Sequence, residues 1–187
     1  MTSMAAFPPR SRWRARCGLA LLSAAGVAAL AWASFASPRP RLVYNPSDSV
    51  AVGWYRIEAP ERRPDALPVG SIVLARLPAA AAALAAQRGY LPVGVPLLKR
   101  VSAVAPQRVC VVGREVRIDD VPVAAALRAD RLRRPLRAWR GCRRLRAGEL
   151  FLLSTLNPAS FDSRYFGPIN ADDVLGIAHR LRPETRP

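Results

Sequence analysis

The sequence predicts a mainly β domain that follows one N-terminal membrane-spanning helix. Two observations lead to this prediction. The run from Cys17 to Ala36 contains no charged residue. After it, short segments rich in β-branched and aromatic residues recur between proline, glycine and aspartate positions, which is typical of strands joined by turns. The chain has 187 residues, of which 51% are hydrophobic, enough for one domain with its own core.

The uncharged run, residues 17–36, is long enough to cross a bilayer, because a helix of this length rises about 30 Å. Residues 1–16 carry four arginines just before it, so we expect a cytoplasmic N-terminus and a domain on the opposite side of the membrane. A cleaved signal peptide is the alternative, because "SFA" before Ser37 has the small-x-small pattern of a processing site. The run exceeds the roughly 7–15 apolar residues of a signal peptide, which favours a retained single-pass anchor.

Beyond the anchor, a linker rich in proline and arginine is expected at residues 37–43, a β-rich domain at 44–182 and a flexible tail at 183–187. One short helix is predicted from "PAAAAALAAQRG", since Pro78 stands at its start and Gly89 just past its end. Eight segments have strand character: "RLVY", "AVGWYRIEA", "GSIVLARL", "PLLKRVSAV", "RVCVVG", "EVRID", "LFLLS" and "DVLGIAHRL".

Cysteine usage fits an exported domain. Of the three cysteines, Cys110 and Cys142 lie outside the apolar run. An oxidising compartment favours a disulfide between them, and two buried free thiols are the alternative. Three cysteines and a single histidine supply no metal-ligand spacing, so we expect neither a metal nor another cofactor.

The chain is strongly basic, with a formal net charge of +16 and a pI near 11.5. Nine arginines fall within residues 128–146. This stretch is interpreted first as a solvated surface, with a lipid-facing surface and a nucleic-acid patch as alternatives. No nucleic acid is expected as a partner, because an exported domain seldom meets it and no binding motif accompanies the charge.

Lys99 is the only lysine among 29 basic residues. Arginine cannot be deprotonated in a protein, whereas a desolvated lysine can lose its proton, so only lysine can act as a general base. Lys99 lies in the apolar run "PLLKRVSAVAP", where strand alternation places Lys99 and Arg100 on opposite faces and turns one of them inward. The alternative is an edge-strand lysine that stays charged with its amine in solvent.

A second segment, "YNPSDSVAVGWY", presents Ser47 and Ser49 in a turn before a strand. A serine hydroxyl becomes a useful nucleophile only when a base takes its proton, and without one Ser49 is an ordinary turn residue. His179 is the other candidate base, but nothing in "GIAHRLRP" is placed to orient it.

A third segment, "NPASFDSRYFGP", holds Asp162 and Arg164 at a spacing that allows them to pair and brace the loop. We expect the Ser163 hydroxyl to hold the amine of Lys99 in position. The alternative for this segment is a structural ion-pair loop without chemistry.

In order and spacing, these three segments resemble the signal peptidase I family, and more closely its conjugative-transfer branch, the TraF-type peptidases that mature pilin precursors. Ala51 stands where the family usually has proline, which is expected to loosen the turn after the nucleophile. The family's nucleophile box is matched in "NPSDSVAVGWY" by Asn45, Ser47, Ser49, Gly53 and Tyr55.

The resemblance implies a role for each box. "LLKRV" resembles the base box, so Lys99 takes the role of general base to Ser49. The backbone N–H of Ser49 and the hydroxyl of Ser47 would hold the oxyanion. "SFDSRYFGP" resembles the last box, which gives Asp162, Ser163 and Arg164 supporting positions.

The resemblance also implies a signal-peptidase-like β-rich domain seated at the lipid bilayer, and a serine endopeptidase that cleaves an exported, pilin-like precursor. Either water or the substrate's own amino terminus can resolve the acyl-enzyme, and the sequence leaves both open. Two alternatives remain: a general leader peptidase of the same family, and a non-catalytic scaffold of a conjugation or secretion apparatus.

Overall fold

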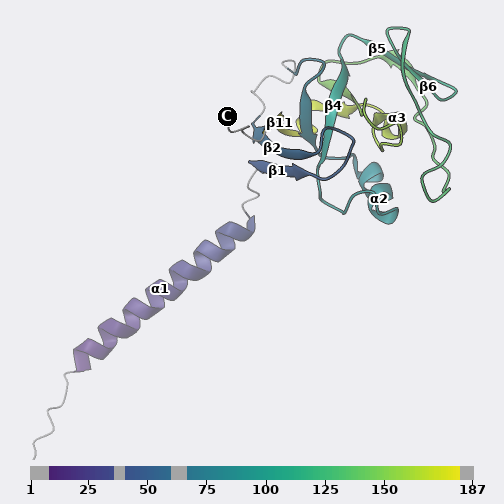
Figure 1. Ribbon diagram of the computed structural model, residues 1–187. Coiled ribbons are helices and arrows are strands. Elements are labelled where there is room, and N and C mark those ends of the chain that lie inside the picture. The colour runs from purple at the N-terminus through teal and green to yellow at the C-terminus, as the bar shows by residue number, and fades with distance from the viewer. Residues whose placement is uncertain (1–8, 36–40, 60–66, 182–187) are drawn as a thin grey trace, which may run out of the picture. The chain divides into compact units, whose positions relative to one another are not determined.

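The computed structural model describes residues 9–35, 41–59 and 67–181 (Figure 1). The chain divides into two compact units, Met1–Arg39 and Pro40–Pro187. The second unit contains all the strands of the described residues, and the prediction of a mainly β fold is confirmed.

The first unit contains the helix α1, Pro9–Phe35. Its segment Trp13–Ala33 has a mean hydropathy of 1.5, so by length and composition the helix can cross a membrane. The helix begins before the predicted anchor because arginine is a good helix former and nothing in "PRSRWRAR" stops it. Ala36 and residues 37–40 of the predicted linker lie outside the described residues, as do residues 1–8 and 182–187.

The second unit is built on a seven-stranded antiparallel sheet with the order β1-β2-β11-β3-β4-β9-β10. Strand β4 lies between β3 and β9 at the interior of this sheet. The strands are β1 (Leu42–Asn45), β2 (Gly53–Glu58), β3 (Ile72–Ala75), β4 (Leu97–Val104), β9 (Glu149–Leu153), β10 (Ile169–Asn170) and β11 (Val174–Arg180).

A smaller antiparallel sheet has the order β7-β6-β5-β8. Cys110 on β5 lies opposite Cys142 on β8, and the two form a disulfide. The strands are β5 (Arg108–Val112), β6 (Glu115–Ile118), β7 (Val121–Ala125) and β8 (Cys142–Arg144). The helices in the described part of this unit are α2 (Ala79–Gln87), α3 (Ser163–Phe166) and the 3-10 turn η2 (Ala171–Asp173).

All eight predicted strand segments contain strands, and α2 forms between Pro78 and Gly89 as predicted. Three strands were not predicted. β7 contains a proline, β8 lies in the arginine-rich stretch without apolar alternation, and β10 has only two residues. β1 begins at Leu42, inside the segment expected to be linker.

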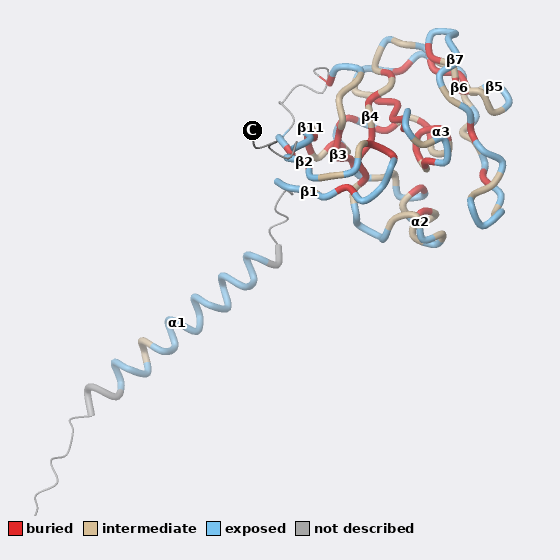
Figure 2. The backbone as a smooth tube through the Cα atoms, viewed as in Figure 1, coloured by how far each residue is buried: buried red, intermediate tan, exposed pale blue. Residues whose placement is uncertain are grey.

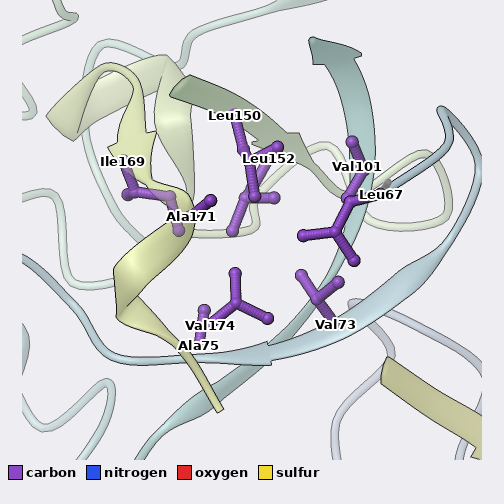
Figure 3. Close-up of a cluster of buried hydrophobic side chains, with 9 residues drawn as sticks. All are labelled: Leu67, Val73, Ala75, Val101, Leu150, Leu152, Ile169, Ala171 and Val174. Atoms are coloured by element: carbon purple, nitrogen blue, oxygen red, sulfur yellow. The ribbon is translucent and has the colours of Figure 1, made fainter. Parts of the chain in front are cut away.

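The large sheet has buried hydrophobic clusters on both of its faces. Val73 and Leu74 on β3 are both fully buried, but they belong to different clusters because successive side chains point to opposite faces. Figure 2 shows buried residues gathered on the central strands and on α3. In the cluster of Figure 3, side chains from β3, β4, β9, β10, the segment around η2 and the loop before β3 point toward one another: Leu67, Val73, Ala75, Val101, Leu150, Leu152, Ile169, Ala171 and Val174.

Candidate active site

Ser49 lies in the turn between β1 and β2, and the Asn45 side chain organises this turn. The Asn45 amide Nδ2 donates to the carbonyl oxygens of Ser47 at 2.7 Å, Val50 at 3.0 Å and Ala51 at 3.2 Å. Asn45 is buried, so these bonds face little competition from water. A side chain that binds three carbonyls of one turn fixes the backbone on both sides of Ser49.

The backbone at Ala51, where the family usually has proline, is anchored by hydrogen bonds. The Tyr55 hydroxyl donates to the Ala51 carbonyl at 2.6 Å, and Asn45 donates to the same oxygen. The turn that follows Ser49 is therefore held by side chains, and the expected loosening is offset.

The hydroxyl oxygens of Ser47 and Ser49 lie 2.9 Å apart. Ser47 also donates to Asn45 Oδ1 at 2.9 Å. A hydroxyl carries a single proton, so while Ser47 donates to Asn45 it can only accept from Ser49. Ser47 must leave Asn45 before it can donate to another oxygen.

Lys99 lies on β4 and is only 6% exposed, whereas the neighbouring Arg100 is partly exposed. The prediction that one of these two side chains points inward is therefore confirmed. The Lys99 amine donates to Ser160 Oγ at 2.6 Å. Burial lowers the pKa of Lys99 to about 8, because desolvation of the charged amine outweighs the attraction of Asp162. At neutral pH a pKa near 8 leaves about a tenth of the amines uncharged.

The expectation for Ser163 is corrected by the structure, which gives the contact with the Lys99 amine to Ser160. Ser163 is the first residue of α3, and its Oγ accepts the backbone N–H of Leu152 at 3.0 Å. The turn from Asn157 to Ser160 is closed by a backbone bond of 3.2 Å. Sequence reasoning missed Ser160 because a serine in a turn is common, although it stands two residues before Asp162 in the same box.

Asp162 and Arg164 form a buried bidentate ion pair, with Arg164 Nε donating to Oδ1 at 2.8 Å and Nη2 to Oδ2 at 2.6 Å. Asp162 also accepts the backbone N–H of Ser154 at 2.9 Å. The pair therefore braces the loop that carries Ser160. The remaining contacts of the Arg164 guanidinium go to the carbonyls of Ala125, Ser154, Asn157 and Pro158.

A cavity of about 1020 Å³ opens over these elements. Its lining includes Ser47, Ser49, Lys99 and Ser160, so the expected nucleophile, base and oxyanion hydroxyl face one space. Apolar residues such as Leu98 form much of the rest of the wall. A lysine amine with a lowered pKa, a hydroxyl and an apolar wall in one cavity suit the attack of a serine on an amide carbonyl.

Three of the expected site residues, Asp162, Ser163 and Arg164, are absent from the lining of this cavity. Their side chains instead hold the loop of Ser160 and the strand β9 in place. His179 is also absent from the lining: it lies on β11, half exposed, with Nε2 3.2 Å from Glu58 Oε2. The second candidate base therefore faces a different part of the domain.

A polar bridge ties the serine turn to the loop of Ser160. The Asn157 side-chain amide donates to the carboxylate of Asp48, which immediately precedes Ser49. Asp48 also raises the pKa of Lys99 through its negative charge, as a smaller influence than burial. Sequence reasoning gave Asp48 no role, because the bridge joins residues far apart in the chain.

Comparison with known proteins places the chain in a family. The family model described as "Signal peptidase, peptidase S26" matches residues 14–181. A probable conjugal transfer protein TraF of Sinorhizobium fredii is 38% identical over 174 residues, which cover 88% of this chain and 87% of that protein. A plasmid transfer protein TraF of Escherichia coli is 33% identical over 108 residues, 53% of this chain and 59% of that protein.

Among solved structures, a signal peptidase I of Enterococcus faecalis V583 aligns with 65% of this chain and 97% of its own, with a TM-score of 0.36 and 18% identity. The family match covers the three boxes that carry Ser49, Lys99 and Asp162. The chain therefore belongs to the signal peptidase family, peptidase S26, with TraF proteins of conjugative transfer among its relatives.

Proposed function

We propose that this peptidase is a membrane-anchored serine endopeptidase with Ser49 as nucleophile and Lys99 as general base. One observation carries the proposal: the only lysine of the chain is buried, has a lowered pKa and lines the same cavity as Ser49. Burying an amine lowers the stability of the fold, so a buried lysine suggests a function that outweighs this loss. Proton transfer is such a function, and arginine cannot perform it.

The reaction proceeds in two halves. Uncharged Lys99 takes the proton of the Ser49 hydroxyl as Oγ attacks the scissile carbonyl, and it then gives that proton to the leaving amine. An ester between Ser49 and the N-terminal part of the substrate remains. Water, or an amine of the substrate itself, then attacks this ester while Lys99 accepts its proton. The bond between the acyl carbon and Ser49 Oγ breaks, and Lys99 returns the proton to Oγ.

The oxyanion of each tetrahedral intermediate is bound by the backbone N–H of Ser49 and by the Ser47 hydroxyl. Ser47 Oγ lies 2.9 Å from Ser49 Oγ, so its hydroxyl is close to the carbonyl that Ser49 attacks. When the oxyanion forms, the Ser47 proton turns from Asn45 to this stronger acceptor. A donor aimed at the developing charge contributes about 3 kcal/mol to the transition state.

The substrate is an exported precursor with small residues before the cut. TraF proteins named for conjugal and plasmid transfer are the relatives, which supports a pilin precursor of a conjugation system. The helix α1 anchors the enzyme in the inner membrane with its N-terminus in the cytoplasm and its β-rich domain in the periplasm.

The test is co-expression of a pilin-type precursor with the wild-type chain or with Ser49→Ala. We expect processing by the wild type only, at equal protein levels. Mass spectrometry of the product distinguishes hydrolysis from cyclisation, because a cyclic product lacks one water. Processing of many unrelated leader sequences would instead support a general leader peptidase. A precursor left intact by the wild type would support the scaffold alternative, and unchanged processing with Ser49→Ala would reject Ser49 as the nucleophile.

Removing the contact of Lys99 is expected to slow chemistry more than binding. In Ser160→Ala the amine loses its 2.6 Å hydrogen-bond partner, and we expect kcat to fall about tenfold with KM little changed, a typical result when a positioning contact is lost. Ser160→Thr keeps the hydroxyl and should recover most of kcat. Equal loss in both variants would show that the site needs the size of serine and not its hydroxyl.

Asp48→Asn tests the electrostatics of Lys99 without removing an acceptor oxygen for Asn157. The charge of Asp48 raises the pKa of Lys99, so its removal lowers that pKa further and leaves more amine uncharged at neutral pH. The ascending limb of the kcat/KM profile should therefore move to lower pH. The exposed Asp172→Asn serves as the control, and identical profiles for wild type and Asp48→Asn would contradict the assignment of that limb to Lys99.

A further inference from the structure

Part of the arginine-rich stretch forms a hairpin that reaches the catalytic cavity. Residues 128–136, here called the arginine hairpin, are held by an antiparallel bridge between Ala129 and Pro135 and by the bond from Leu136 N to the Arg128 carbonyl at 2.8 Å. In Figure 1 this segment is the green loop beyond β6 that descends to the level of α2. The hairpin contributes Ala129, Asp130, Arg131, Leu132, Arg134 and Leu136 to the cavity wall.

Asp130 makes the tip of the hairpin rigid. Its Oδ1 accepts the backbone N–H groups of Leu132 and Arg134, each at 2.9 Å. Its Oδ2 accepts from the Tyr90 hydroxyl and from Arg134 Nε, the latter at 2.7 Å. Desolvation raises the pKa of Asp130, but these hydrogen bonds outweigh it and hold that pKa well below its ordinary value. The carboxylate is thus ionised, and its two oxygens are occupied by donors of the hairpin and by Tyr90.

Two of the arginines at this end of the cavity hold the hairpin in place. Arg88, just after α2, donates to the Pro135 carbonyl at 2.9 Å. Arg134 donates to the Arg88 carbonyl at 2.9 Å, and its guanidinium lies 5.5 Å from the centre of the Tyr90 ring. Both guanidinium groups therefore have structural partners. Arg131 is the third arginine that lines the cavity.

Arg131 stands at the exposed tip of the hairpin and lines the cavity. In the part of the chain that the structure describes, its guanidinium has no hydrogen bond or ion pair. Arg88, Arg131 and Arg134 against Asp130 leave a net charge of 3 − 1 = +2 on this wall. An arginine fork held on a rigid turn beside excess positive charge is suited to a carboxylate.

An aromatic cluster connects this wall to the catalytic base. Phe161 follows Ser160, the partner of Lys99, and its ring lies 5.4 Å from that of Tyr90 and 5.7 Å from that of Tyr165. The Tyr165 hydroxyl accepts the backbone N–H of Leu127 at 3.0 Å, at the base of the hairpin. The hairpin and the Ser160 loop thus form one continuous wall of the cavity.

We propose that the arginine hairpin binds a carboxylate of the precursor that Ser49 cleaves, with Arg131 as the direct contact. This inference rests on the proposed function and deepens it, because it makes a negatively charged group near the cut a determinant of the substrate. An acidic side chain and a free C-terminal carboxylate present the same chemistry to the guanidinium. The precursor is drawn into the cavity by this charge and oriented before the carbonyl reaches Ser49.

The test measures binding without cleavage. The full-length Ser49→Ala protein in detergent micelles is titrated, by fluorescence anisotropy, into labelled peptides with Ala-x-Ala before the scissile bond. One peptide series carries aspartate or asparagine at each position flanking that bond, and a second ends in a free carboxylate or an amide. Each series is repeated in Arg131→Gln, and in Arg137→Gln as a matched control, because Arg137 is exposed and absent from the cavity lining.

We expect a carboxylate peptide to bind about fivefold more tightly than its neutral counterpart, the size that a partly exposed ion pair supports. Arg131→Gln should abolish this preference and Arg137→Gln should retain it. The series in which the preference appears identifies the source as a side chain or a C-terminus. No preference in either series, or equal loss in both variants, would overturn the proposal.

A second arm tests a lipid as the occupant. If Arg131→Gln weakens binding of soluble short-chain phosphatidylglycerol and leaves the peptide preference unchanged, the hairpin contacts lipid and the proposal is overturned. Because binding is measured without turnover, its outcome is separate from that of the proposed function. A carboxylate preference that persists while the wild type processes no precursor would leave the binding site standing and reject the peptidase mechanism.

Discussion

Lys99→Arg is expected to reduce precursor processing by about 10³-fold or more, although it preserves the positive charge. The guanidinium stays protonated at every accessible pH, so it cannot accept the proton of the Ser49 hydroxyl. The larger group must also fit where the Lys99 amine donates to Ser160 at 2.6 Å. Processing is measured by the loss of precursor in cells that contain equal amounts of each variant.

Two controls separate lost chemistry from lost folding. Arg100→Lys makes the reciprocal exchange at the next residue of β4, whose side chain donates to the Gly70 carbonyl, and it should process normally. Lys99→Met removes the amine at nearly constant volume, and it should be inactive but at least as stable as the wild type, because no charge has to be buried. Processing by Lys99→Arg at the wild-type rate would disprove the proton-acceptor role.

The stability of the Lys99→Met variant relative to wild type should also depend on pH. The folded-state pKa of about 8 lies below the ordinary value of 10.5, so the folded wild type pays for a buried charge at pH values below 8. As the pH rises from about 8 toward 10.5 the amine loses its charge and this cost disappears. The difference in free energy of unfolding between Lys99→Met and the wild type should therefore shrink. Chemical denaturation at several pH values measures the difference.

Asp162→Ala is expected to destabilise the domain by about 3–5 kcal/mol, because it leaves Arg164 as a buried charge without its counter-ion. The Ser154 backbone N–H loses its acceptor as well. In a domain of this size such a loss lowers the melting temperature by roughly 10 °C. Thermal unfolding followed by circular dichroism, with the exposed Asp172→Ala as the control, measures the effect.

Asp162 is expected to support activity only through the structure of the site. The residue lies behind the cavity and acts by fixing the loop that carries Ser160. Activity of Asp162→Ala should therefore fall together with stability and recover in part at low temperature. A variant with unchanged melting temperature and no activity would instead make Asp162 a direct participant in the chemistry.

Much of the fold followed from local patterns, because strands with alternating apolar residues and a helix bounded by proline and glycine have local causes. Lys99 was also predictable, since it is the only lysine of the chain, and the serine turn was predicted from its resemblance to the nucleophile box of a known family. Ser160 was not, because its role depends on how its loop folds against β4. The hydrogen bond between Tyr90 and Asp130 joins residues 40 apart in the sequence, and no local pattern signals it.

The central claim is that catalysis proceeds through an ester on Ser49. The most direct measurement is rapid acid quenching of the wild-type enzyme during turnover of its precursor, followed by peptide mapping with mass spectrometry. We predict that the peptide containing Ser49 carries the N-terminal part of the substrate, and that Ser49→Ala shows no such adduct. Turnover without an adduct on Ser49, or with an adduct on another residue, would contradict the proposed mechanism.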